Sequence, residues 1–180
     1  MNRQSKHTPR HLYIDNGLYF ITGAIYLKRP LIIHEGLKQH LLELIRGYFR
    51  KYNWELHHWV ILDDHYHVLG KSLKGKDLSS IIKGIHKTSG LAVHKQTGCR
   101  KPVWWNYWDY CCRDEIDYMT RLNYLLYNPV KHGYTENLKD YLYSSFNETF
   151  LRVGREKLVG QFRRYPEYKG LTLVENEDNY

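Results

Sequence analysis

The chain has 180 residues, of which 42% are hydrophobic and 15% aromatic, and it carries a formal net charge of +8 because Lys and Arg outnumber Asp and Glu by 27 to 19. This hydrophobic content is enough to build the core of one domain and excludes a chain that is disordered throughout. The positive charge predicts a polyanionic partner, and 17 Tyr with 5 Trp favour nucleic acid, because aromatic rings stack on unpaired bases while cations bind phosphates.

Local patterns predict seven elements. Runs of β-branched and aromatic residues are typical of strands, apolar residues at spacings of three and four indicate amphipathic helices, and Asp63-Asp64 is a natural turn between two strands. Asp77 and Asp114 are suited to helix N-caps, and Pro129 is expected to end the last helix. In chain order the prediction is a strand at 18–26, a helix at 35–51, strands at 54–62 and 65–72, a helix from 77 towards 93, a strand at 103–112 and a helix from 114 to 129.

This order predicts an α+β fold. Strand, helix, strand, strand, helix, strand is the split βαβ pattern of a ferredoxin-like domain, with a central antiparallel sheet and helices on one face. A further helix and a C-terminal extension follow, and we expect the tail after about Arg164 to be loosely held.

The cysteines and the N-terminus bear on the compartment. Cys99, Cys111 and Cys112 lack CxxC spacing, which argues against a disulfide framework or a cysteine zinc site and favours a reducing cytosol. The first ten residues are polar, and no apolar run is long enough to span a bilayer. We therefore expect a soluble, cytoplasmic protein.

Two histidines stand out in the stretch His65-Tyr66-His67. Side chains two residues apart on a strand point to the same face, so His65 and His67 could bind one metal ion while Tyr66 points away. Two imidazoles would leave room for oxygen ligands. An isolated HxH pattern is more typical of ordinary strand residues, so this pattern alone favours a structural role over a metal site.

A second pair lies on the last predicted helix. Tyr124 and Asn128 are one turn apart and fall roughly opposite an apolar stripe formed by Ile116, Met119, Leu122 and Leu126, whereas Tyr127 falls nearer that stripe. Such a phenol could be a nucleophile and such an amide a ligand. The alternative is an ordinary packing role for the tyrosine, and the position of Asn128 before a proline disfavours helical geometry.

Four segments together resemble the REP-associated tyrosine transposases, which belong to the single-tyrosine HUH transposases. They are Trp59–Leu69 around the histidines, Trp108–Glu115, Asn123–Gly133 with its Asn-Pro-Val-Lys-His-Gly stretch, and Tyr143–Phe146. Their order and separation match over residues 10–150. The resemblance implies a transposase domain over residues 1–153 and a C-terminal extension over 154–180, partly flexible.

The resemblance also implies an enzyme with defined roles. His65, His67 and Asn128 would bind a divalent metal, Mg²⁺ or Mn²⁺, and Tyr124 would nick and rejoin single-stranded or hairpin DNA through a 5′-phosphotyrosine. Repetitive palindromic elements are the implied substrates, and a monomer or a homodimer is compatible with the family. The sequence departs from the family in its bulky Tyr66, where a smaller aliphatic residue is common, and in lacking a proline before Asp64.

Several basic and aromatic residues are candidates for DNA contacts. Lys71, Lys74 and Lys76 could equally be solvated surface charges, and that role is favoured for Lys83, Lys87 and Lys131, as a place in the core is for most of the aromatic residues. A non-cleaving DNA- or RNA-binding module is the alternative function. The candidate cations are Lys71, Lys74, Lys76, Lys83, Lys87 and Lys131, and the candidate stacking residues are Trp104, Trp105, Tyr107, Trp108 and Tyr110.

Overall fold

A four-stranded antiparallel sheet forms the centre of the protein. The computed structural model describes residue 11 and residues 13–173. The sheet has the order β2-β3-β1-β4, which is the split βαβ topology expected from the sequence. Its strands are β1 (Leu18–Ile25), β2 (Glu55–Ile61), β3 (His65–Lys71) and β4 (Trp104–Cys111).

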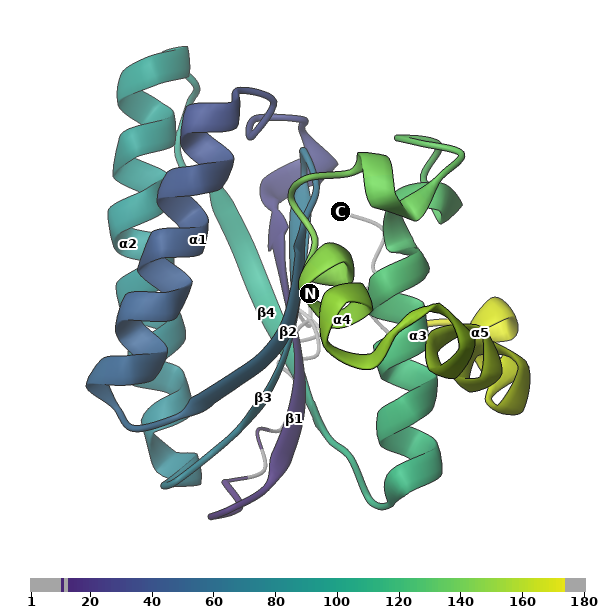
Figure 1. The fold of residues 1–180 in the computed structure, drawn as a ribbon. Coiled ribbons are helices and arrows are strands. Elements are labelled where there is room, and N and C mark those ends of the chain that lie inside the picture. The colour runs from purple at the N-terminus through teal and green to yellow at the C-terminus, as the bar shows by residue number, and fades with distance from the viewer. Residues whose placement is uncertain (1–10, 12, 174–180) are drawn as a thin grey trace, which may run out of the picture.

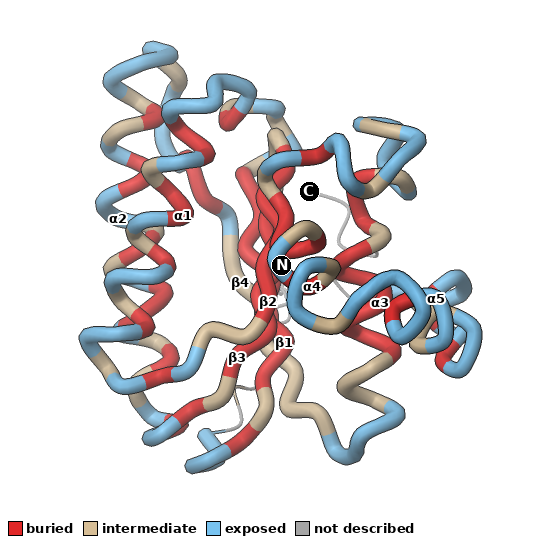
Figure 2. Tube along the Cα trace, in the orientation of Figure 1, coloured by how far each residue is buried: buried red, intermediate tan, exposed pale blue. Residues whose placement is uncertain are grey.

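Helices cover both faces of this sheet (Figure 1). α1 (Glu35–Lys51) and α2 (Leu78–Thr97) lie side by side on one face, and α3 (Glu115–Lys131), α4 (Phe146–Val153) and α5 (Arg155–Arg164) lie on the other. Buried residues follow the sheet and the inward sides of the helices in two clusters, one on each face (Figure 2). Short 3-10 helices complete the fold: η1 (Tyr26–Lys28), η2 (Gly75–Asp77), η3 (Leu138–Asp140) and η4 (Pro166–Gly170).

The element boundaries follow the local signals of the sequence closely. α1 has the predicted bounds, and α2 continues past Val93 to Thr97, where Gly98 takes a left-handed conformation at φ 65°. The Asp114 side chain caps α3 by accepting from the amide of Asp117, whereas the Asp77 side chain makes no capping bond.

The predicted end of α3 is wrong. The helix continues through Pro129 to Lys131, so Asn128 is helical although it precedes a proline. The imino ring removes one backbone hydrogen bond, but Pro129 and Asn128 are both buried, and this packing outweighs the local cost.

The expected apolar stripe on α3 is also wrong in part. Ile116 is 60% exposed, whereas Tyr124 is 3% exposed and lies in the cluster between α3 and the sheet. The helix is covered on two sides, because α5 and η4 pack against it opposite the sheet and the Asn123 amide donates to the carbonyl of Tyr165. A one-sided stripe therefore does not describe this helix.

The chain after Arg164 is better held than we expected. Residues 165–173 include η4, and Tyr168 is buried with its ring 5.3 Å from that of Tyr127 on α3. Burial of Tyr168 and Leu173 against α3 accounts for this order. Residues 174–180 lie outside the described part of the chain.

Candidate active site

The two histidines of β3 lie under α3. β3 pairs with β1 so that His65 is opposite Ala24 and His67 is opposite Thr22. The imidazole rings of His65 and His67 are 4.9 Å apart, while Tyr66 points to the other face of the sheet and contacts His86 and Trp104 on that side. The alternation of side chains on a strand thus places both imidazoles on the face that α3 covers.

His65 is oriented by the residue before it. Its Nδ1 lies 2.6 Å from Oδ1 of Asp64. Burial raises the pKa of the Asp64 carboxyl, but the hydrogen bond and the charge of His65 outweigh this effect and hold the pKa below its ordinary value. In the neutral tautomer that donates its Nδ1 proton to Asp64, Nε2 keeps its lone pair, and this Nε2 lies 3.3 Å from Oδ1 of Asn128.

His67 is oriented by the neighbouring strand. Its Nδ1 is 2.8 Å from Oγ1 of Thr22, and its Nε2 is buried without a hydrogen-bond partner. Burial lowers the pKa of His67 well below its ordinary value, and the nearby His65, His132 and Lys131 lower it further. His67 is therefore neutral, and in the tautomer whose Nδ1 donates to Thr22 its Nε2 is an acceptor.

Asn128 and Tyr124 reach the histidines from α3. Asn128 is fully buried, and its Nδ2 has no hydrogen-bond partner. The Tyr124 ring lies 5.5 Å from that of His67, and Lys131 donates a hydrogen bond to the Tyr124 Oη at 3.1 Å. The helix therefore brings Tyr124, Asn128 and Lys131 to the two histidines.

These residues fit a divalent cation. Nε2 of His65, Nε2 of His67 and Oδ1 of Asn128 are three acceptors, and the first and the last face each other with no proton between them when His65 has its Nδ1 proton. Within the described residues there is no group of three or more His, Cys, Asp or Glu that could hold a metal. The third member of the candidate set is instead an asparagine, and mixed imidazole and amide ligation suits Mn²⁺ and is tolerated by Mg²⁺.

Two orienting residues were missed by sequence reasoning. Thr22 contacts His67 across the β1–β3 register, which only a correct strand pairing would have revealed. Asp64 precedes His65 directly, and the carboxylate beside a candidate ligand was a signal that could have identified it. His132 also lies here, with its ring 5.1 Å from that of His65, and burial lowers its pKa to about 4.

The other candidate lysines are not at the histidines. Lys71 is six residues from His65 along β3, a separation of about 20 Å at the rise of a strand, and Lys74 and Lys76 lie beyond it. Lys83 and Lys87 are on α2, on the opposite face of the sheet. Of the six candidate cations, the structure brings only Lys131 to the candidate active site, and contact with DNA stays a prediction for all of them.

The aromatic candidates divide between core and surface. Trp104 and Trp108 are buried, as expected for residues that fill the core beside β4. Trp105 is 38% exposed, and Tyr107 and Tyr110 are partly buried. One tryptophan therefore presents its ring to solvent.

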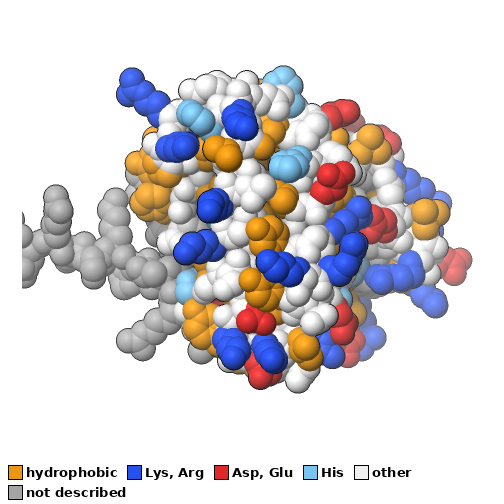
Figure 3. Space-filling model, turned by 90° about the vertical axis from the view of Figure 1, so that its left-hand side faces the viewer, with side chains coloured by type: hydrophobic (Ala, Val, Ile, Leu, Met, Phe, Trp, Pro, Cys, Tyr) orange, Lys and Arg blue, Asp and Glu red, His pale blue; other side chains and the backbone are white. Residues whose placement is uncertain are grey.

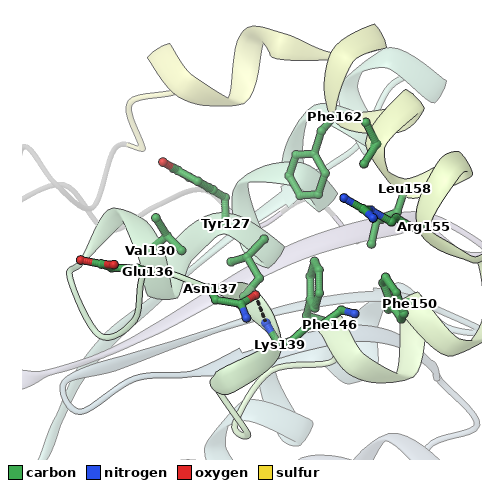
Figure 4. Close-up of a pocket in the computed structure, with 12 residues that line it drawn as sticks. Tyr127, Val130, Glu136, Asn137, Lys139, Phe146, Phe150, Arg155, Leu158 and Phe162 are labelled. Carbon is green, nitrogen blue, oxygen red and sulfur yellow. Dashed lines mark hydrogen bonds between the residues drawn. The ribbon is translucent and has the colours of Figure 1, made fainter.

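A separate cavity of about 620 Å³ lies among α3, η3, α4 and α5 (Figure 4). Three phenylalanines, Phe146, Phe150 and Phe162, line it together with Arg155 and Lys139. None of the four residues of the candidate active site is in its lining, so this cavity is distinct from that site.

Comparison with known proteins identifies the class to which this α+β domain belongs. Residues 20–112 match the family described as "Transposase IS200 like", and this match runs from within β1 to the end of β4 and includes both histidines. The match ends before α3, so Tyr124 and Asn128 lie outside it.

Matches to individual proteins are longer than the family match and extend over α3. The REP-associated tyrosine transposase of Escherichia coli K12 is 28% identical over 145 residues, which cover 79% of this chain and 84% of the relative. A relative from Haemophilus influenzae is 28% identical over 156 residues, with coverage of 77% and 84%. A solved structure of a REP-associated tyrosine transposase bound to a REP hairpin has a TM-score of 0.69 and 27% identity, and covers 82% of this chain and 87% of that one.

The chain belongs to the IS200-like transposase family. Its activity is therefore that of a DNA transposase, and its fold is the α+β fold of the REP-associated tyrosine transposases. Among the described residues, no helix has the length and apolarity needed to cross a membrane.

Proposed function

We propose that the protein cleaves and rejoins single-stranded DNA, with Tyr124 as the nucleophile and a divalent metal, Mg²⁺ or Mn²⁺, bound by His65, His67 and Asn128. The observation that supports this proposal best is the convergence of His65, His67 and Asn128 beside Tyr124, with His67 and Asn128 buried and His65 partly buried. Buried polar groups normally have partners, so the unpartnered Nε2 of His67 is costly unless a ligand such as a cation joins it.

A divalent metal held there would polarise a non-bridging phosphate oxygen and neutralise charge in the transition state. The protein's own groups prepare the site for it. Asp64 and Thr22 hold the Nδ1 sides of the two imidazoles, which turns both Nε2 atoms towards α3.

Tyr124 performs the covalent step in this proposal. Its Oη attacks the phosphorus, an O–P bond forms and the bond from phosphorus to the 3′-oxygen breaks. The phenolic proton passes to solvent and the departing 3′-oxygen gains one, so a 5′-phosphotyrosine and a 3′-hydroxyl remain. The reverse attack by a 3′-hydroxyl rejoins the strand without ATP.

Lys131 assists Tyr124. Its ammonium donates a hydrogen bond to Oη and lies 4.4 Å from the ring centroid, so it stabilises negative charge that develops on the phenol oxygen. Because Tyr124 is only 3% exposed, the substrate must open the Tyr124 surroundings to reach this oxygen.

The substrate is single-stranded or hairpin DNA. The solved relative is bound to a REP hairpin, and the +8 charge of this chain suits the same chemical class of ligand. We extend the proposal to hairpins of repetitive palindromic elements.

The test is a covalent trapping experiment. A labelled hairpin oligonucleotide with a single-stranded extension, incubated with the protein and Mn²⁺, should give a labelled band that survives denaturing electrophoresis. Tyr124→Phe should abolish this band, and Tyr127→Phe, three residues along the same helix, should retain it. A band that persists in Tyr124→Phe contradicts the proposal, and binding without a band under any divalent metal would identify a non-cleaving DNA-binding module instead.

A further inference from the structure

A groove of about 600 Å³ lies between α2 and the start of β4, on the face of the sheet opposite α3. Apolar and basic side chains line it, and its lining contains no acidic residue. The lining residues are Lys83, His86, Lys87, Gly90, Leu91 and residues 101–105.

The charge of this region is one-sided. Residues 78–108 contain no Asp or Glu and contain five cations, namely Lys83, Lys87, Lys95, Arg100 and Lys101. Lys83 and Lys87 are one helical turn apart, so they project from the same side of α2, and both are exposed, as is Lys101 across the groove. Figure 3 shows the face formed by α1 and α2, on which Lys, Arg and hydrophobic side chains are interleaved. A groove with cations on both sides and no carboxylate in its lining is complementary to a polyanion.

The floor and rim of the groove are aromatic and well supported. Trp104 lies flat on His86, with ring centroids 4.4 Å apart and an interplanar angle of 6°, and its Nε1 donates to Oγ of Ser89 at 2.9 Å. Trp105 at the rim is 38% exposed and its ring lies 5.0 Å from that of Tyr26. An exposed indole held by a second ring is a suitable platform for a nucleobase.

The groove and the candidate active site lie near the same end of β1, on opposite faces of the sheet. At the end of β1, Ala24 pairs with His65 on one side and Ile25 pairs with Trp104 on the other. β3 and β4 are therefore separated only by β1, a distance of about 10 Å at the usual strand spacing. A strand of DNA that leaves the histidines can reach the groove by crossing the end of β1.

We infer that this α2–β4 groove binds unpaired nucleotides of the DNA strand that extends from the cleaved phosphate, with a base stacked on Trp105 and phosphates near Lys83, Lys87 and Lys101. The inference rests on the proposed function for the identity of the ligand as DNA. The base is unpaired because a paired base inside a duplex has both of its faces stacked on neighbouring bases and cannot stack on the indole.

The experiment measures binding without cleavage. A hairpin with a single-stranded extension and the same hairpin without it are titrated against full-length Tyr124→Phe protein in EDTA, with fluorescence anisotropy as the readout. Adding Trp105→Ala should weaken binding of the extended hairpin about tenfold, the effect of losing one stacked base, and should leave the blunt hairpin unchanged. Trp105→Phe should restore most of the affinity because it keeps an aromatic face.

The lysines are tested by the salt dependence of the same binding. The double substitution Lys83→Ala and Lys87→Ala should lower the magnitude of the slope of log binding constant against log salt concentration by about 1.4. This is about 0.7 for each phosphate of a single strand that a lysine no longer neutralises. The matched control is replacement of Lys157 and Lys169, two exposed lysines of α5 and η4, which removes the same charge. An equal change of slope in the control overturns the inference, as does an equal loss of affinity for the blunt hairpin in Trp105→Ala.

The outcome is independent of the proposed chemistry. Loss of the extension-dependent binding in Trp105→Ala, together with no covalent adduct in the protein that retains Tyr124, would refute the nicking proposal and support the groove. A Tyr124-dependent adduct together with unchanged binding in Trp105→Ala would support the nicking proposal and refute the groove.

Discussion

Nε2 of His65 and Oδ1 of Asn128 face each other at 3.3 Å, and in the neutral tautomer whose Nδ1 donates to Asp64 both atoms are acceptors. Nε2 of His67 lies beside them, buried and without a hydrogen-bond partner. This relationship between a strand and a helix that are 63 residues apart in sequence is the basis of the proposed metal site.

Divalent metal should stabilise the fold. Because Mn²⁺ binds the folded chain and not the dispersed ligands of the unfolded one, a concentration 100 times the Kd should raise the free energy of unfolding by about 2.7 kcal/mol. Urea unfolding with and without Mn²⁺ measures this gain, and Asn128→Ala or His67→Ala should lose most of it. His57→Ala is the control, since His57 bonds Tyr118 outside the site, and a gain that survives in Asn128→Ala would refute the ligand set.

Lys131 should matter for the rate of the covalent step. Lys131→Met removes the donor to the Tyr124 Oη and should slow adduct formation at saturating hairpin by about a hundredfold, a typical effect of removing one group that stabilises charge in a transition state. Single-turnover trapping at several hairpin concentrations separates this rate from binding. Lys139→Met, which removes a cation that lies over Phe150, should leave the rate unchanged. If Lys131→Met raises only the hairpin concentration needed for half-maximal adduct formation and leaves the maximal rate unchanged, Lys131 is a phosphate contact and not an aid to the nucleophile.

Two histidines with lowered pKa values, His58 and His86, should make the fold sensitive to acid. Burial lowers the pKa of His86 to about 3, and burial together with Arg152 lowers that of His58 to about 3. Above about pH 6.5, the ordinary pKa of a histidine in the unfolded chain, the histidine is unprotonated in both the folded and the unfolded chain. Between about pH 6.5 and the lowered pKa of the folded chain, only the unfolded chain binds the proton. Stability should therefore fall as the pH is lowered below 6.5, by about 1.4 kcal/mol per pH unit for each histidine.

Urea unfolding at pH 7 and pH 5 tests this dependence. His86→Gln should lower stability at pH 7, because it removes the stacking on Trp104 and the contact with the Tyr66 hydroxyl, and it should also make the loss between pH 7 and pH 5 smaller by about 2 kcal/mol. The same loss in the wild type and in His86→Gln would show that His86 is not held neutral.

Tyr66 and Gly23 should be energetically coupled. The Tyr66 ring lies over Gly23 on β1, where any Cβ would overlap it, so Gly23→Ala should destabilise the fold by about 1–3 kcal/mol. Tyr66→Leu removes the ring and should make Gly23→Ala tolerable. A double-mutant cycle by urea unfolding measures the coupling, and strictly additive effects would contradict it.

Local sequence patterns predict the sheet and its flanking helices well because each signal acts within a few residues. Apolar spacing defines α1, the Asp63-Asp64 turn separates β2 from β3, and alternation on β3 puts His65 and His67 on one face. The resemblance to a known family supplied the pairing of these histidines with Tyr124 and Asn128, which the structure places together.

Features that depend on tertiary contacts were not predictable in this way. Tyr124 is buried because α3 is enclosed between the sheet and the C-terminal helices, and Pro129 stays helical because its neighbours bury it. The contact from Thr22 to His67 depends on strand register, and the exposure of Trp105 beside a buried Trp104 depends on the register irregularity between β1 and β4 at this end of the strand.

The most direct test of the central claim is to locate the covalent bond. Trypsin cleaves after Arg121 and Lys131, so digestion of the trapped adduct should release a peptide of residues 122–131 that contains both Tyr124 and Tyr127. Tandem mass spectrometry is expected to find the 5′-phosphate of the DNA on Tyr124. A phosphate on Tyr127, or on any residue outside this peptide, would contradict the assignment of Tyr124 as the nucleophile.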